Sequence, residues 1–290
     1  MYTQIRGYEI FSLTQGQGRP MLLIHGGPGL DHTYLRPWLD PLGKHVQLTY
    51  YDQLGNGRST RPESYEGISF ATLVDEADVL RASLGYERII LFGHSFGGSL
   101  ALEYALRYGR HLDGLILCNT VPVLDYQADP QNHGTPEQVQ AAVSGMSDPA
   151  ALAEDHVWRQ AWMKVLPLSF RTYNPQIGAA MDEAMQYSGK AFAHSNTRCL
   201  PTFNVLHRLS EISVPTLVMT GRHDWMTPPT PGAERIHTAL PDSKLVIFEQ
   251  SGHFPFIEEQ DRFIATVSAW LADLREKSSR LGEPSCTMSS

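Results

Sequence analysis

Short apolar runs alternate with longer helical patterns along most of the sequence, and this alternation constrains the fold more than any other feature. The runs are nearly continuous in aliphatic and aromatic residues, as expected of parallel strands that are covered on both faces. They are VQLTYYD (46–52), RIILFGH (88–94), LDGLILCN (112–119), PTLVMTG (215–221) and KLVIFEQ (244–250). The helical patterns occupy 70–85, 96–109, 230–241 and 256–277.

The start of the chain has a different pattern. IRGYEIFSL, a GQG turn and PMLLIH predict a hairpin that enters the sheet. An antiparallel element followed by strand–helix–strand units predicts an α/β fold with a mostly parallel, doubly wound sheet of about eight strands.

One interval interrupts the alternation. Between Thr120 and Pro215 there is no convincing strand, and the segment is rich in Ala, Gln, Met and aromatic residues. A crossover needs only about a dozen residues and its helix, so we expect a helical cap inserted after the sixth strand. It would lie at the edge where parallel strands end and ligands bind. The predicted division is a core at 1–121 and 212–275, a cap or lid at 122–211 and a polar C-terminal tail at 276–290.

Composition and charge disfavour several classes of function. The formal net charge of −8 argues against nucleic acids and anionic membranes as partners. The N-terminal MYTQIRGYEIF has no secretory-signal pattern, and no apolar run is long enough to span a membrane. The 3 cysteines suit neither a disulfide framework nor a metal knuckle, which favours a reduced, cytoplasmic setting. No nucleotide-binding or H-E-x-x-H motif occurs, so we expect no cofactor and no metal.

The segment Gly93-His94-Ser95-Phe96-Gly97 matches G-x-S-x-G between a predicted strand and a predicted helix. A serine on such a sharp turn needs a strained backbone, and the flanking glycines remove the Cβ atoms that would clash there. The helix N-terminus then faces any oxyanion that forms nearby. We therefore predict Ser95 as a nucleophile.

A serine nucleophile needs a base and an orienting acid, which follow in the order Ser, acid, His on an elbow of this kind. Asp224 and His253 each come just after a predicted strand, at the same sheet edge as Ser95. We predict Asp224 as the acid and His253 as the base. The alternatives are a helix-capping role for Asp224 and an ordinary loop position for His253.

The turn His25-Gly26-Gly27-Pro28-Gly29 follows the strand MLLI. A glycine-rich turn allows a backbone N–H to approach a reacting carbonyl, so we predict an oxyanion hole from the N–H groups of Gly27 and Phe96. A tight turn without a ligand role is the alternative. The loop 52–59 carries two glycines, and we expect it to buttress the oxyanion turn rather than to take part in the chemistry.

The set HGGPG, DQLGNGRS, GHSFGGSLALEYA, GRHDWMTP and SGHFPF resembles the α/β-hydrolase superfamily, and within it the proline iminopeptidase branch. The resemblance covers 20–120 and 213–272. It implies the same triad and oxyanion residues. Two positions depart from the branch, since Leu54 stands where it often has Arg and His94 precedes the serine where it often has a small residue.

The resemblance also implies that acidic cap residues hold the free α-amino group of the substrate, since a buried ammonium needs a carboxylate partner. The candidates are Glu154, Glu183 and Glu211, beside Asp155 and Asp182. Trp158 and Trp162 either line an apolar pocket under the lid or form the buried stripe of an amphipathic helix.

These features predict a serine hydrolase that works through an acyl-enzyme on a small molecule or short peptide. The first expectation is an aminopeptidase that releases N-terminal proline or another small residue. The alternative is a carboxylesterase, lactonase or amidase acting on a small acyl substrate. A ligand-sensing homologue of this fold is a remoter alternative.

Overall fold

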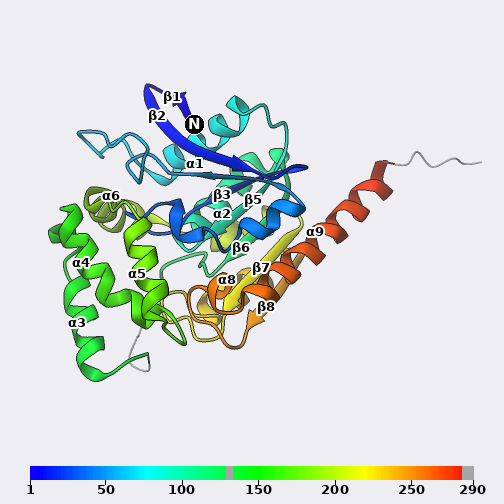
Figure 1. Ribbon diagram of the computed structural model, residues 1–290. Coiled ribbons are helices and arrows are strands. Elements are labelled where there is room, and N and C mark those ends of the chain that lie inside the picture. The colour runs from blue at the N-terminus through cyan, green and yellow to red at the C-terminus, as the bar shows by residue number, and fades with distance from the viewer. Residues whose placement is uncertain (129–132, 283–290) are drawn as a thin grey trace, which may run out of the picture.

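A single eight-stranded sheet forms the centre of the molecule in the computed structural model, which describes residues 1–128 and 133–282 (Figure 1). The strand order is β1-β2-β4-β3-β5-β6-β7-β8. From β4 to β8 all neighbouring strands are parallel, whereas β1 and β2 are antiparallel additions at one edge. The strands are β1 (Tyr2–Ile5), β2 (Tyr8–Gln15), β3 (Pro20–Ile24), β4 (Gln47–Tyr51), β5 (Ile89–His94), β6 (Leu112–Cys118), β7 (Thr216–Gly221) and β8 (Ser243–Phe248). The predicted α/β fold with a mostly parallel sheet is confirmed.

The entry of the chain into the sheet differs from the prediction. The tight hairpin joins β1 to β2 through Arg6 and Gly7, both at positive φ. The segments on either side of the GQG turn, β2 and β3, do not pair with each other, because β4 lies between them. Since β2 pairs antiparallel with β4 from Ser12 to Gln15, the GQG segment is a connection across β4 rather than a hairpin turn.

Helices cover both faces of the sheet, because alternate strand residues point to opposite sides. In β3, Leu22 and Ile24 pack into the cluster that contains α1 (Phe70–Ser83) and α2 (Phe96–Tyr108). Met21 and Leu23 pack into the cluster on the other face, which contains α9 (Gln260–Gly282). Two short helices complete the core, α7 (Arg235–Ala239) and α8 (Pro255–Glu258).

The chain between β6 and β7 forms a separate group of helices at one end of the sheet (Figure 1). They are α3 (Pro136–Met146), α4 (Asp155–Val165), α5 (Pro175–Ala184) and α6 (Gly189–His194). Side-chain caps mark where these helices begin: Thr135 forms a capping box with Gln138, and Asn174 and Ser188 accept backbone N–H groups of α5 and α6. In the described part of this segment the only β pairing is one bridge between Val123 and Asn204. We call this group of helices the cap.

The C-terminal helix extends further than the sequence suggests. The sequence predicts a polar tail from residue 276 onward, but α9 continues to Gly282. The stretch EKSSRL at 276–281 includes the good helix formers Glu, Lys, Arg and Leu, which is consistent with a helix that continues to Gly282. Residues 283–290 of the predicted tail lie outside the described part of the chain.

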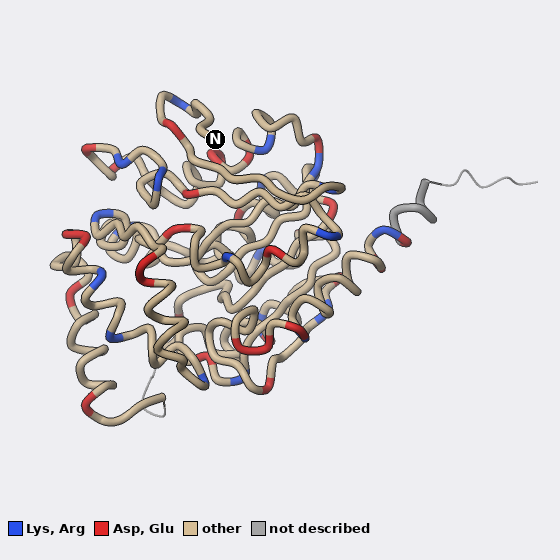
Figure 2. Tube along the Cα trace, viewed as in Figure 1, with Lys and Arg blue, Asp and Glu red and all other residues tan. Residues whose placement is uncertain are grey.

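Charged residues are distributed along the described part of the trace, with basic and acidic positions intermixed (Figure 2). Within the described residues, no helix combines the length and the apolarity that crossing a bilayer requires.

Candidate active site

Ser95 lies at the turn between β5 and α2, with a φ of 55° and a ψ of −122°. A positive φ is strained for a residue that carries a Cβ, and such strain is concentrated at functional sites. The neighbouring glycines are required by close packing: a Cβ on Gly93 would collide with the carbonyl oxygen of Gly97, and one on Gly97 with that of Ile24. The turn is held by its own backbone, since the N–H groups of Gly98 and Ser99 donate to the Ser95 carbonyl.

The structure brings Asp224 and His253 together. Asp224 follows β7 and His253 follows β8, and the Nδ1 of His253 lies 2.8 Å from the Oδ2 of Asp224. Both residues are 3% exposed. A hydrogen bond from Nδ1–H to the carboxylate leaves Nε2 without a proton, which is the tautomer that a general base needs.

Four further donors, from three residues, hold the Asp224 carboxylate. The backbone N–H groups of Met226 and Thr227 donate to Oδ1, and the Nδ2 of Asn119 and the hydroxyl of Thr227 donate to Oδ2. Burial by itself raises the pKa of Asp224, but the charge of His253 and the hydrogen bonds from His253, Thr227 and Asn119 outweigh burial and hold the pKa well below its usual range. The carboxylate is therefore ionised throughout the range in which a histidine base works.

The roles of Asn119 and Thr227 were missed in the sequence. Asn119 follows β6 directly, at a φ of 47°, and its side chain also donates to the carbonyl of Gly252 in the loop of His253. Two signals were available: the position just beyond a strand end at the active edge, and an asparagine, the residue other than glycine that best tolerates positive φ.

The turn after β3 offers one candidate oxyanion donor. The N–H of Gly26 donates to the hydroxyl of Tyr34, and the carbonyl of Gly26 accepts from the Nδ1 of His25 at 2.7 Å. Because a trans peptide is planar, with its N–H pointing opposite to its C=O, His25 fixes the direction of the Gly27 N–H. The second candidate, the N–H of Phe96, belongs to the first residue of α2, where backbone N–H groups have no intrahelical acceptor.

The loop after β4 supports this turn, as its sequence suggests. The N–H of Gln53 donates to the Nε2 of His25, and the side-chain amide of Gln53 donates to the His25 carbonyl at 2.8 Å. Asn56 accepts the N–H of Gly29 at 2.9 Å. The two loops are thus joined by hydrogen bonds on both sides of the Gly26–Gly27 peptide.

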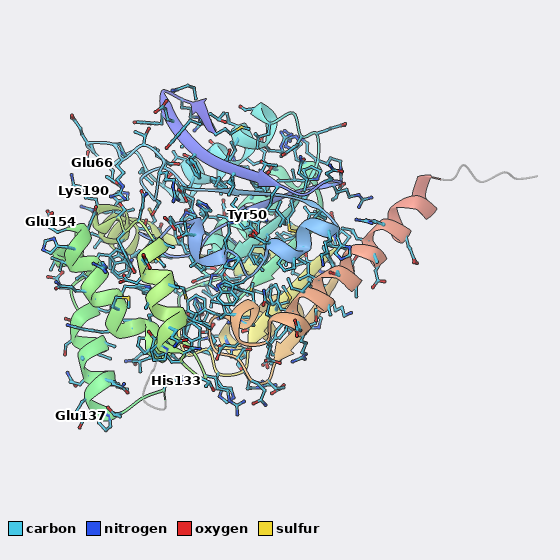
Figure 3. The ribbon with its side chains drawn as sticks, viewed as in Figure 1. Tyr50, Glu66, His133, Glu137, Glu154 and Lys190 are labelled. Carbon is cyan, nitrogen blue, oxygen red and sulfur yellow. The ribbon has the colours of Figure 1, made fainter. Side chains whose placement is uncertain are left out.

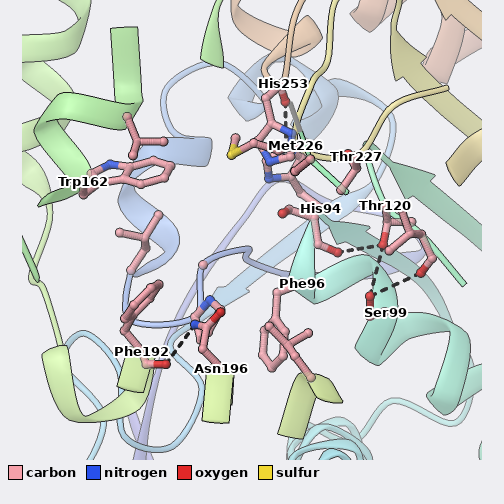
Figure 4. Close-up of a pocket in the computed structure, with 18 of the residues that line it drawn as sticks. His94, Phe96, Ser99, Thr120, Trp162, Phe192, Asn196, Met226, Thr227 and His253 are labelled. Carbon is pink, nitrogen blue, oxygen red and sulfur yellow. Dashed lines mark hydrogen bonds between the residues drawn. The ribbon is translucent and has the colours of Figure 1, made fainter. Parts of the chain in front are cut away.

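A cavity of about 300 Å³ opens between the sheet edge and the cap (Figure 4). Ser95, His253, Gly27 and Phe96 all line it. The cap contributes mainly apolar side chains, namely Met146, Trp158, Trp162, Val165, Phe192 and Leu200, together with Asn196. The two tryptophans therefore lie on the cavity wall and also form the buried face of α4, so the two alternatives considered for them coincide.

The acidic residues expected to bind a substrate amine are not brought to this cavity. Glu154, Glu183 and Glu211 are all exposed, and Glu154 lies on the outer side of the cap (Figure 3). Glu211 is paired with Arg208 at 2.9 Å. The physical reason lies in the helix faces: α4 turns Trp158 and Trp162 inward, so the polar positions around them face solvent. Within residues 1–128 and 133–282, no carboxylate lines the cavity.

A buried group of Asp31, His32 and Asp52 has the composition of a metal site, but its oxygens are engaged in hydrogen bonds. Asp52 accepts from His32 and from the N–H of Arg58, and Asp31 accepts from Thr33 and, at 2.9 Å, from the N–H of Gln186. The last bond joins the segment that follows the glycine-rich turn to the cap. The hydrogen bonds of Asp31, His32 and Asp52 thus connect the segment after β3, the loop after β4 and the cap.

Known proteins share both the sequence pattern and the fold. A family model described as alpha/beta hydrolase fold matches residues 19–260. The proline iminopeptidase of Saccharolobus solfataricus is 28% identical over 93% of this chain and 91% of its own length. That of Lactobacillus helveticus is 29% identical over 91% of this chain and 95% of its own length. The crystal structure of the enol-lactonase from Burkholderia xenovorans LB400 superposes with a TM-score of 0.76 at 24% identity, covering 94% of this chain and 100% of the enzyme.

Proposed function

Since the chain belongs to the α/β-hydrolase fold family, we propose that it is a serine hydrolase that works through an acyl-enzyme at Ser95. The observation that carries the proposal is the hydrogen-bonded Asp224–His253 pair lining one cavity with a serine on a strained elbow. These are the three groups that nucleophilic catalysis by serine requires.

The proposed reaction has two halves. In the first, the Oγ of Ser95 bonds to the carbonyl carbon while the Nε2 of His253 takes the hydroxyl proton. Collapse of the tetrahedral intermediate breaks the bond to the leaving group, which receives that proton from His253. In the second, a water molecule gives a proton to His253 and its oxygen bonds to the acyl carbon. The bond between that carbon and the Oγ of Ser95 then breaks, His253 returns the proton to Oγ, and the carboxylic acid leaves. Asp224 stabilises the imidazolium that forms in each half.

The N–H groups of Gly27 and Phe96 are proposed to bind the oxyanion. Each donor of this kind is worth about 3–4 kcal/mol of transition-state stabilisation. The positive end of the α2 dipole adds to the field at the same place.

The substrate class that the cavity supports best is an ester with an uncharged, apolar acyl group. In the described residues the lining contains aromatic and aliphatic side chains and no Asp, Glu, Lys or Arg. An ammonium buried there would lack a carboxylate partner, which is costly, whereas an acyl chain gains from the burial of its surface. The amidase and lactonase alternatives share this requirement for an uncharged acyl group.

An aminopeptidase that releases N-terminal proline is the second candidate. It is supported by the full-length similarity to relatives named proline iminopeptidase, at 28% and 29% identity. The absence of a cavity carboxylate from the described residues is what places it second.

The test compares p-nitrophenyl acetate and butyrate with proline p-nitroanilide, using wild-type protein and Ser95→Ala. We expect repeated turnover of the esters, weak cleavage of the anilide and no turnover by Ser95→Ala. Ser147→Ala, which changes an exposed serine of the cap, is the matched control and should keep full activity. Strong cleavage of the anilide alone would establish the aminopeptidase, and a single slow acylation without turnover would support a ligand sensor. Full activity of Ser95→Ala would refute the mechanism.

We also propose that the enzyme acts in the cytoplasm on a small diffusible substrate. Cys118 and Cys199 support this proposal, because both are buried free thiols, which suit a reducing compartment.

A further inference from the structure

His94, the residue before the candidate nucleophile, is fully buried and takes no part in the chemistry proposed above. Its two ring nitrogens contact two different loops. Nε2 lies 2.9 Å from the carbonyl oxygen of His253, and Nδ1 lies 2.8 Å from the hydroxyl oxygen of Tyr34. Two buried polar contacts from one ring, each to a different catalytic segment, need a physical explanation.

The direction of each hydrogen bond follows from the acceptor at one end. A carbonyl oxygen can only accept, so the Nε2 of His94 carries the proton and donates to His253. In a neutral ring Nδ1 is then an acceptor, and the Tyr34 hydroxyl must donate to it. The hydroxyl oxygen in turn accepts the N–H of Gly26. The chain therefore runs in one direction, from Gly26 through Tyr34 and His94 to His253.

A neutral His94 is consistent with its surroundings. Burial lowers the pKa of His94, and the neighbouring His253 lowers it further. The centroids of the two imidazole rings lie 4.8 Å apart, so a neutral His94 spares the imidazolium of His253 a close like charge. Tyr34 and Phe256 pack around the same ring, with centroids 5.5 Å and 5.1 Å from it.

The chain of hydrogen bonds ends at the N–H of Gly26, the residue before the candidate oxyanion donor. Gly26 is held at its N–H by Tyr34 and at its carbonyl by His25. The N–H of Gly26 belongs to the His25–Gly26 peptide and its carbonyl to the Gly26–Gly27 peptide. The two bonds therefore fix the peptide planes on both sides of the Gly26 Cα, and the second of these planes carries the Gly27 N–H. Release of the Tyr34 bond frees the His25–Gly26 plane, which adjoins the plane of the Gly27 N–H at the Gly26 Cα, and also removes the link between the turn and the loop of His253.

We propose that Tyr34 and His94 are positioning residues: their hydrogen bonds tie the Gly26–Gly27 turn to the main chain of His253 and hold the Gly27 N–H where the oxyanion forms. The inference rests on the acyl-enzyme mechanism proposed above. Preorganised donors are effective because they need no rearrangement during the reaction. Loosening one donor should therefore lower kcat and leave KM nearly unchanged.

The experiment uses the full chain with p-nitrophenyl butyrate, or with proline p-nitroanilide if that is the substrate turned over. Tyr34→Phe removes only the hydroxyl, and we expect kcat to fall about tenfold or more with KM unchanged. His94→Leu should produce a similar loss, and the double variant should lose little beyond either single variant, because the residues act as one bridge. His94→Gln should recover most of the activity, since its amide offers an acceptor and a donor at the spacing of the two ring nitrogens.

A second readout separates positioning from general destabilisation. Butylboronic acid forms a bond from the Oγ of Ser95 to boron, His253 takes the displaced proton, and the tetrahedral adduct carries a negative charge. We expect its inhibition constant to rise in Tyr34→Phe in proportion to the fall in kcat/KM. The matched control is Tyr104→Phe, which removes another buried hydroxyl, bonded to Asp78 at 2.8 Å, and should leave kcat and inhibition unchanged.

Two results would overturn the inference: a kcat for Tyr34→Phe within twofold of wild type, or His94→Gln losing as much activity as His94→Leu. Failure of the proposed function is distinguishable, because the wild-type protein itself would then turn over neither substrate.

Discussion

Asp224→Asn tests the candidate triad most sharply, because both carboxylate oxygens act only as acceptors in the hydrogen bonds that the structure shows, and an asparagine would place a donor at one of them. Oδ1 accepts from the backbone N–H groups of Met226 and Thr227, which cannot reverse their polarity. Oδ2 accepts from His253, Asn119 and the Thr227 hydroxyl. The amide oxygen of an asparagine must therefore face the backbone, and its NH₂ group must face His253.

This orientation sets the size of the effect. Facing an NH₂ donor, the Nδ1 of His253 can only accept, so the ring proton moves to Nε2 and the base is lost. Forcing this wrong tautomer costs about 10⁴-fold in kcat in a serine protease with the same arrangement, and we expect a loss of that order here. The Thr227 hydroxyl can rotate to accept, but the Nδ2 of Asn119 then faces another donor. One buried donor without an acceptor costs about 1–3 kcal/mol of unfolding free energy.

The assay is kcat for p-nitrophenyl butyrate, with urea unfolding in parallel. Asp113→Asn is the control. Asp113 pairs with Arg88 at the start of β6, whereas the candidate active site lies beyond the ends of the parallel strands, so this substitution should affect neither kcat nor stability strongly. A loss of less than about tenfold in kcat for Asp224→Asn, in a folded protein, would refute the role of Asp224.

Two further changes test the packing around the site. Burial raises the pKa of Glu76 from 4.5 to about 8, although the N–H of Leu54 donates to its carboxylate. As the pH rises, the unfolded chain therefore loses this proton before the folded chain does. The free energy of unfolding falls between pH 4.5 and about 8 and then levels off. Glu76→Gln should remove this decline of about 1.4 kcal/mol per pH unit in the free energy of unfolding, and its stability should match that of the wild type below pH 4.5. Urea unfolding at several pH values measures both. Curves of stability against pH that run parallel for the variant and the wild type would contradict the prediction. In Gly98→Ala the new Cβ would lie 2.5–2.7 Å from three atoms of Thr120, whose hydroxyl donates to the Ser95 carbonyl. We expect a fall in kcat together with about 1–3 kcal/mol of lost stability, and unchanged kinetics would show that the elbow does not depend on Thr120.

The sequence predicts the fold well because the relevant signals are local. The apolar runs are strands buried on both faces, and their order along the chain limits the sheet to a few topologies. The same local signals predict Ser95, Asp224 and His253: each lies in the turn or loop that follows a strand, and the ends of parallel strands meet at one edge. The structure places all three there and brings Asp224 and His253 within hydrogen-bond distance.

The interior of the cap and the supports of the site could not be predicted in the same way. Helical spacing shows which residues share a face but not which face turns toward the substrate, and the acidic residues chosen as an amine clamp proved to face solvent. Tyr34 and His94, or Asn119 and Asp224, are far apart in the chain, so their pairing depends on the packing of loops. The spacing of apolar and polar residues along the chain does not predict contacts of this kind.

The carbonyl of Gly29 has a consequence for how such enzymes could be re-engineered. This single oxygen accepts both the indole N–H of Trp158 and the backbone N–H of Ser188, so the cap is fastened to the turn that begins at His25. A cap transplanted from another hydrolase would have to reproduce both donors, or the turn beneath it would lose its fastening. Exchange of substrate range by grafting should therefore carry a kinetic penalty unless the segment from His25 to Asp31 is transferred with the cap.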